Sequence, residues 1–178
     1  MTDHIAGLLG VEPAGIIYTS GASESNNLAI KGIAQASRST GRHMISTVLE
    51  HASVGGTLTA LQQQGWEVDL LDIQRDGTID LEQLGDLLRK DTILVSVCAV
   101  DSELGTVQPI RQITEILKDF PNCRLHVDAT QAIGKTELVM DGVDTMSIAP
   151  HKFYGLNGSG LLLKKSSVII EPQIHGGS

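Results

Sequence analysis

The alternation of short β-rich runs with longer amphipathic runs restricts the fold of this chain more than any other feature. Runs rich in β-branched and other apolar residues favour strands over residues 16–19, 44–48, 67–71, 93–97, 124–127 and 145–148. Helical periodicity lies between most of them, over residues 25–36, 54–64, 81–89 and 110–118. Two later strands are expected at 158–163 and 168–170, joined by the polar turn 164–167. This alternation predicts an α/β fold with a mostly parallel sheet and helices on both faces.

Length and charge limit the class of protein. The 178 residues suffice for one sizeable core, and no repeat or linker divides them, so we expect a single domain over residues 1–178. A net charge of -8 without a basic cluster disfavours nucleic acid and anionic membranes as partners. The longest apolar stretches, such as residues 93–100, are too short to span a bilayer, and the first residues do not resemble a signal peptide. These features predict a cytoplasmic protein without a membrane partner.

The two cysteines do not indicate a metal or redox site. Cys98 and Cys123 lie in or beside apolar runs and lack C-x-x-C spacing. Two cysteines also cannot form a disulfide framework for a domain of this size. We therefore expect both to be small buried hydrophobic residues and expect no metal ligands.

Ligands of open α/β sheets bind beyond the carboxyl ends of the strands, so the residues that follow each strand are the candidates for a site. Ser20–Glu24 forms a glycine-containing turn into a helix, whose free N–H groups can hold a phosphate. A Ser/Glu capping box explains the same residues equally well. His51 follows the second strand, where a lone histidine is more often structural than catalytic.

Two later strand ends carry a carboxylate and an amine. Asp128 follows the fifth predicted strand, with Thr130 and Gln131 close by, and His151 and Lys152 follow the sixth. Taken singly, the aspartate also suits a helix cap and the lysine a solvated surface. An amine can form a Schiff base with an aldehyde, and a carboxylate can keep a pyridine nitrogen protonated. The convergence of these groups predicts a binding site for pyridoxal 5'-phosphate (PLP).

Several motifs occur in the order found in one known family. They are Thr19–Asn27, Glu50-His51, Glu103–Gly105 with Val107–Pro109, His126–Gln131, Gly134-Lys135, His151–Gly155 and His175–Gly177. Together they resemble the class V aminotransferase family, most closely the cysteine desulfurases, over essentially the whole chain. The resemblance implies the large, cofactor-binding domain of a PLP-dependent transferase.

The resemblance also implies a role for each candidate residue. Lys152 would bear the Schiff base with PLP, Asp128 would pair with the pyridine nitrogen, and His51 would stack on the ring. Lys152 and His51 are the implied catalytic residues. Gln131 would donate a hydrogen bond to the phenolic oxygen of the cofactor. The phosphate would be held by Ala22, Ser23 and His151.

A cysteine desulfurase removes sulfur from L-cysteine and yields alanine and a persulfide on an enzyme cysteine. Membership in this branch would imply a small amino-acid substrate similar to cysteine, a homodimer that shares the cofactor site, and a sulfur-acceptor protein. It would also imply a part in iron–sulfur cluster assembly.

The chain departs from the family pattern in ways that leave three functions open. The family's N-terminal segment, its second domain, its sulfur-accepting cysteine and its substrate-binding arginine have no counterpart among the 178 residues. Ser102 stands where the family has an asparagine, and Ala149 where it has a phosphate-binding serine. The chain is then an incomplete desulfurase, a catalytically inactive domain that acts by association, or another PLP-dependent lyase or aminotransferase of this class.

Overall fold

The computed structural model describes residues 2–176, so Gly177 of the His-Gly-Gly motif lies outside the described residues. Within them, seven strands form one sheet in the order β1-β7-β6-β5-β4-β2-β3. The strands are β1 (Ile16–Thr19), β2 (His43–Thr47), β3 (Glu67–Leu71), β4 (Thr92–Cys98), β5 (Arg124–Asp128), β6 (Thr145–Ile148) and β7 (Gly160–Lys164). Only β7 is antiparallel to its neighbours among these strands. The predicted α/β fold with a mostly parallel sheet is confirmed.

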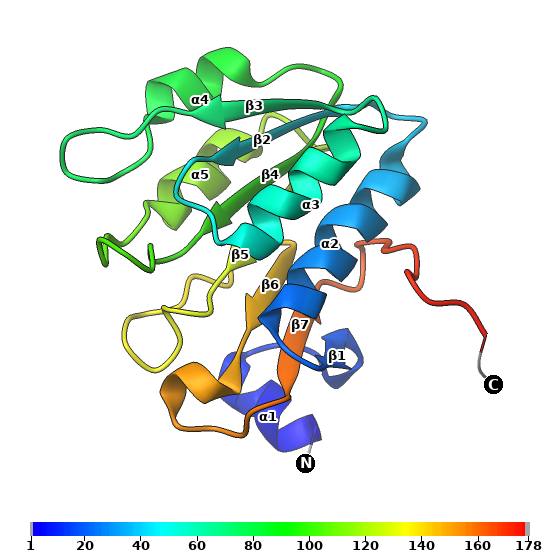
Figure 1. The fold of residues 1–178 in the computed structure, drawn as a ribbon, viewed down its shortest axis with the longest axis vertical. Coiled ribbons are helices and arrows are strands. Elements are labelled where there is room, and N and C mark those ends of the chain that lie inside the picture. Colours follow the sequence, from blue (N-terminus) through cyan, green and yellow to red (C-terminus); the bar gives the residue numbers. More distant parts are fainter. Residues whose placement is uncertain (1, 177–178) are drawn as a thin grey trace.

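Helices cover both faces of the sheet, as predicted. They are α1 (Thr2–Leu9), α2 (Ala22–Ser37), α3 (Ala52–Gln62), α4 (Leu81–Leu87) and α5 (Ile110–Leu117), with short 3-10 turns η1 (Pro13–Gly15) and η2 (Pro150–Phe153). Figure 1 shows α2 and α3 in front of the sheet, where they enclose a core that includes Ile33 and Leu58. The remaining helices pack on the other face around a second core that includes Leu84 and Ile113. None of the helices within residues 2–176 is long and apolar enough to cross a membrane.

The prediction of a strand at residues 168–170 is wrong. This segment is extended but joins no strand ladder, and β1 already pairs with β7 at this side of the sheet. Instead, the buried side chain of Val168 packs in the core beneath α2 and α3, and the N–H of Glu171 donates to the carbonyl of Gly32 at 3.1 Å. An apolar run of this length is equally suited to packing against a helix. Helix α1 was not predicted from the sequence.

The direction of the strands places the candidate residues at one edge of the sheet. Strands β1 to β6 all run in the same direction, so their carboxyl ends gather at one edge, where the reversed β7 begins. There Gly160 approaches the backbone of Gly21 so closely that a Cβ atom on Gly160 would lie 2.5 Å from the Gly21 Cα. This backbone contact fixes the turn before α2 over the end of the sheet.

Candidate functional site

A cavity of about 690 Å³ lies at the carboxyl edge of the sheet. All of the residues predicted from the strand ends and the family resemblance line it: Ala22, Ser23, His51, Asp128, Gln131, His151 and Lys152. The structure therefore brings together side chains from four separate strand ends. Their individual roles remain predictions.

The start of α2 forms one wall of the cavity. Ala22, Ser23 and Glu24 make up its first turn, and the first intrahelical hydrogen bond runs from Ser25 N to Gly21 O at 3.1 Å. The N–H groups of the first turn consequently have no partner within the helix, and the helix dipole favours an anion beside them. Glu24 accepts hydrogen bonds from the N–H and hydroxyl of Ser20 at 2.7 and 2.6 Å, which lower the pKa of its carboxyl. Glu24 thus bonds to Ser20, whereas the N-cap residue Gly21 has no side-chain cap, and the binding of an anion at this helix start stays a prediction.

His51 lies at the second strand end, where it caps α3. Its Nδ1 faces the backbone N–H of Ser53 at 3.1 Å and the hydroxyl of Ser53 at 2.9 Å. Because the backbone N–H can only donate, Nδ1 accepts, and the ring proton of a neutral His51 is on Nε2. The histidine thus combines a capping role with a place in the cavity wall.

Asp128 ends β5 with its carboxylate almost fully buried at the cavity. Its Oδ1 accepts from the N–H of Thr130 at 2.9 Å, and its Oδ2 accepts from Asn26 Nδ2 at 2.8 Å. Each oxygen retains a further lone pair for a ligand. Such a carboxylate can accept a hydrogen bond from a protonated ring nitrogen.

Lys152 and His151 are exposed side chains of the η2 turn, which directly follows β6. Tyr154 closes this turn in the left-handed region with a φ of 66°, and Gly155 N donates to Pro150 O at 2.9 Å. The turn places Lys152 in the lining of the cavity. On the neighbouring loop, Gln131 Oε1 accepts from Lys135 Nζ at 2.8 Å, which leaves the amide NH₂ group of Gln131 as a donor.

The acid Glu50, which precedes His51, is enclosed beside the cavity. Its Oε1 accepts from Cys98 N at 2.8 Å and from the Thr47 hydroxyl at 2.9 Å, and its Oε2 is buried with no partner among the described residues. Burial raises the pKa of Glu50 to about 8, against the hydrogen bonds that lower it. Apart from the Glu50-His51 pair, no sequence pattern predicts that this acid is enclosed.

Both cysteines are buried, as expected, but Cys98 also lines the cavity. Burial, with the nearby carboxyl groups of Glu50 and Asp128, raises the pKa of the Cys98 thiol. Burial raises the pKa of Cys123 to about 12. Since the thiolate is the reactive form, a raised pKa disfavours either cysteine as a nucleophile.

The loop after β4 contains Ser102, which stands where the sequence resemblance leads one to expect an asparagine, and its neighbour Asp101. Asp101 is buried and holds its own turn, since its Oδ2 accepts from the N–H groups of Glu103 and Leu104. Ser102 lines the cavity. Asp101 therefore has a structural role, and Ser102 offers the hydroxyl on this side of the site.

Asn26 is the site residue that the sequence analysis missed. Although it lies on α2, it is fully buried and contacts Asp128, His126 and Ser53 through hydrogen bonds. The signal was present, because Asn26 occupies the buried stripe of α2 that continues with Ala29, Ile30 and Ile33. A polar residue on an apolar helical stripe is buried and therefore needs hydrogen-bond partners.

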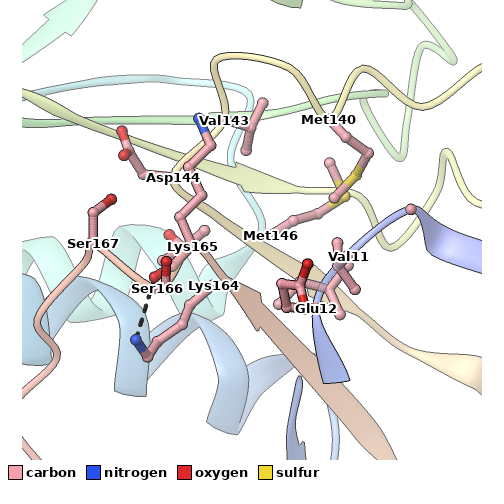
Figure 2. A pocket seen from close by; sticks show the side chains of 13 residues that line it. Val11, Glu12, Met140, Val143, Asp144, Met146, Lys164, Lys165, Ser166 and Ser167 are labelled. Atoms are coloured by element: carbon pink, nitrogen blue, oxygen red, sulfur yellow. Dashed lines mark hydrogen bonds between the residues drawn. The ribbon is translucent and has the colours of Figure 1, made fainter. Parts of the chain in front are cut away.

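A second cavity, of about 310 Å³, lies at the opposite edge of the sheet, where β6 begins and β7 ends. Figure 2 shows Val11, Glu12 and Met140 on one side of it and Asp144 and Lys165 on the other. Lys164 turns its amine to the carbonyls of Lys165 and Val168 rather than to the space. None of the predicted site residues lines this cavity.

The sequence pattern that defines the family described as Aminotransferase class-V matches residues 1–178 of this chain. The chain belongs to the class-V aminotransferase family. It is similar to the NifS/IcsS protein homolog of Lactobacillus delbrueckii subsp. bulgaricus, with 46% identity over 98% of this chain and 46% of that protein. It is also similar to the cysteine desulfurase IscS of Dictyoglomus turgidum, with 41% identity over 99% of this chain and 45% of that protein.

Several solved structures are also similar to this member of the class-V aminotransferase family. A NifS-like protein has a TM-score of 0.95 and 37% identity, over 99% of this chain and 49% of its own. SspA in complex with cysteine has a TM-score of 0.92 and 37% identity, over 99% of this chain and 52% of its own. The chain thus spans about half the length of the curated relatives and solved structures that it matches.

Proposed function

We propose that this chain forms the cofactor-binding part of a PLP-dependent cysteine desulfurase. The observation that carries the proposal is the cavity at the carboxyl edge, whose lining combines a helix start, an imidazole, a carboxylate and an amine. Two further observations support L-cysteine as the substrate. A similar protein is named a cysteine desulfurase, and a similar structure, that of SspA, is in complex with cysteine.

The cavity suits the cofactor in size and in chemistry. Its volume of about 690 Å³ is within the range of about 300 to 1,000 Å³ that is usual for small-molecule sites. In its lining, Thr130 Oγ1 is buried and has no hydrogen-bond partner among residues 2–176. Buried hydroxyls normally have a partner, so a polar ligand beside Thr130 would satisfy it.

The residues divide the binding of PLP among them. When bound, PLP supplies an aldehyde and a ring that accepts electrons. The N–H groups of Ala22 and Ser23, the hydroxyl of Ser23 and the side chain of His151 would hold the phosphate. Asp128 would accept a hydrogen bond from the ring nitrogen, and His51 would stack on the ring. The amide NH₂ group of Gln131, which is left free by the bond to Lys135, would donate to the phenolic oxygen.

Lys152 has two tasks in this proposal. Its amine would hold the aldehyde of the cofactor and, when free, could act as the base and acid for a proton on the α-carbon of an amino-acid substrate. Its place in an exposed turn suits such exchange, because the side chain can move without repacking the core.

The thiolate that takes the sulfur comes from outside this cavity. Cys98 is the only cysteine in the lining, and its buried thiol has a raised pKa. The sulfur acceptor, the homodimer and a part in iron–sulfur cluster assembly belong to the proposal on the strength of the similar proteins.

Borohydride reduction in the presence of PLP, followed by peptide mapping, tests the proposal. We expect the pyridoxyl group on Lys152 and its loss in Lys152→Ala. The control Lys165→Ala, which changes a lysine outside the cavity, should keep the label. A label on surface lysines alone would refute the lysine assignment. Release of alanine and sulfur from L-cysteine identifies a desulfurase, whereas a keto-acid product identifies an aminotransferase.

A further inference from the structure

The side chain of Asn26, which does not itself line the cavity, makes three hydrogen bonds to buried or half-buried neighbours. Its Nδ2 donates to Asp128 Oδ2 at 2.8 Å and to Ser53 Oγ at 2.9 Å. Its Oδ1 faces His126 Nε2 at 3.0 Å. Since an amide oxygen can only accept, His126 carries its proton on Nε2 and donates to Asn26.

This arrangement determines which of the surrounding groups carry the hydrogens and donate them. Burial lowers the pKa of His126 to about 4, so the ring is neutral near pH 7, and its Nδ1 accepts from the Thr145 hydroxyl at 2.9 Å. Ser53 Oγ accepts from Asn26, so its own hydrogen is free to donate to His51 Nδ1 at 2.9 Å. A continuous chain of hydrogen bonds therefore runs from Thr145 through Asn26 to His51.

Packing alone does not require an asparagine here. The buried apolar residues Ala29, Ile30 and Ile33 already fasten α2 to the sheet. Asparagine is a poor helix former, by roughly 0.5 to 0.7 kcal/mol relative to alanine, and a buried amide is costly unless its bonds are made. The amide of Asn26 makes three hydrogen bonds, each with a group that lines or supports the cavity.

We propose that Asn26 is a positioning residue of the cofactor site. It binds Asp128 directly and His51 through Ser53, and so holds the carboxylate and the imidazole in a fixed relation across the cavity. The inference rests on the proposed function, in which these two groups contact the PLP ring.

The test compares Asn26→Asp, Ser53→Ala and Ser53→Thr. The first variant keeps the shape of Asn26 but removes its donors, the second removes only the link to His51, and the third keeps the hydroxyl. Asn27→Asp is the matched control, since it adds the same charge one residue along α2, where the amide contacts only Ser23 O. Nitrogen-15 NMR of the histidine rings in the cofactor-free protein and spectral titration with PLP are the two measurements.

Each measurement has a defined result. In the cofactor-free protein, His126 and His51 should carry their protons on Nε2, and Asn26→Asp, unlike Asn27→Asp, should hold His126 protonated at pH 7. Asn26→Asp should weaken PLP binding about 10-fold or more and shift the absorption maximum, as expected for the loss of a bond to a charged group. Ser53→Ala should weaken it by about 2- to 10-fold, and Ser53→Thr should restore it.

Wild-type affinity and absorption in Asn26→Asp would overturn the proposal, because the network would then serve the fold alone. Should Asn26→Asp not fold, equal PLP affinity and spectra in Ser53→Ala and Ser53→Thr would overturn it. Failure of the wild-type protein to bind PLP refutes the proposed function instead. The network is then judged on the cofactor-free spectra, where a proton on Nδ1 of neutral His126 or His51 overturns it.

Discussion

At the scale of single residues, Ala149 is where the site departs most clearly from the family pattern. It lines the cavity as a fully buried methyl group where the family has a phosphate-binding serine. We expect Ala149→Ser to tighten PLP binding by about 10- to 100-fold, since a bond to a charged group contributes about 1.5 to 3 kcal/mol. Spectral titration measures the dissociation constant. The exposed Ala14→Ser serves as the control, and unchanged or weaker binding in Ala149→Ser would contradict the phosphate assignment.

Asp128 and Lys152 could be located from the sequence because each lies at or shortly after the end of a strand. The carboxyl ends of parallel strands meet at one edge of the sheet, so these residues come together there. Asn26 could not be located in this way, because two of its partners, Asp128 and His126, are about a hundred residues away in the chain. Which side of α2 meets the end of β5 depends on the packing of the whole helix. No local pattern contains that information.

At the scale of elements, α2 packs at Gly32 against residues 168–171, part of which the sequence predicts to be a strand. A Cβ atom at Gly32 would lie 2.2 Å from Ile170 Cγ2 and 2.8 Å from Glu171 O. We expect Gly32→Ala to lower the free energy of unfolding by about 1 to 3 kcal/mol, the usual effect of overpacking, despite the higher helix propensity of alanine.

Urea denaturation of Gly32→Ala and of a matched helical glycine checks this packing. At Gly56, in α3, an added Cβ atom meets nothing within 4 Å, so Gly56→Ala should raise stability by up to about 1 kcal/mol. If both variants were stabilised alike, residues 168–171 would not pack on α2 as described. Apart from α1, the other helices and strands were predicted to within about three residues at each end, because their apolar periodicity is strong.

At the scale of the whole molecule, the enclosed acid Glu50 makes stability depend on pH. Its pKa of about 8 is above the ordinary value of 4.5, so between these values the folded chain binds a proton that the unfolded chain lacks. The stability contributed by this proton is complete below about pH 4.5 and is lost as the pH rises through about 8. Glu50→Gln removes this dependence.

We therefore expect Glu50→Gln to gain stability relative to wild type as the pH rises from 5 to 8, with a slope of at most about 1.4 kcal/mol per pH unit. Urea denaturation at several pH values measures the difference. The exposed Glu82→Gln should show a constant difference over the same range. A constant difference for Glu50→Gln as well would mean that Glu50 is ionised in the folded protein.

The contact between Gly21 and Gly160 sets an order of events for synthesis and folding. The turn before α2 leaves the ribosome some 140 residues before the strand that holds it in place. Closing so long a loop is slow compared with forming a helix or a hairpin. A nascent chain that stops before β7 contains every side chain proposed to bind the ligand but not the backbone contact that holds the turn before α2 in place, so the proposed site matures only after β7 has been made.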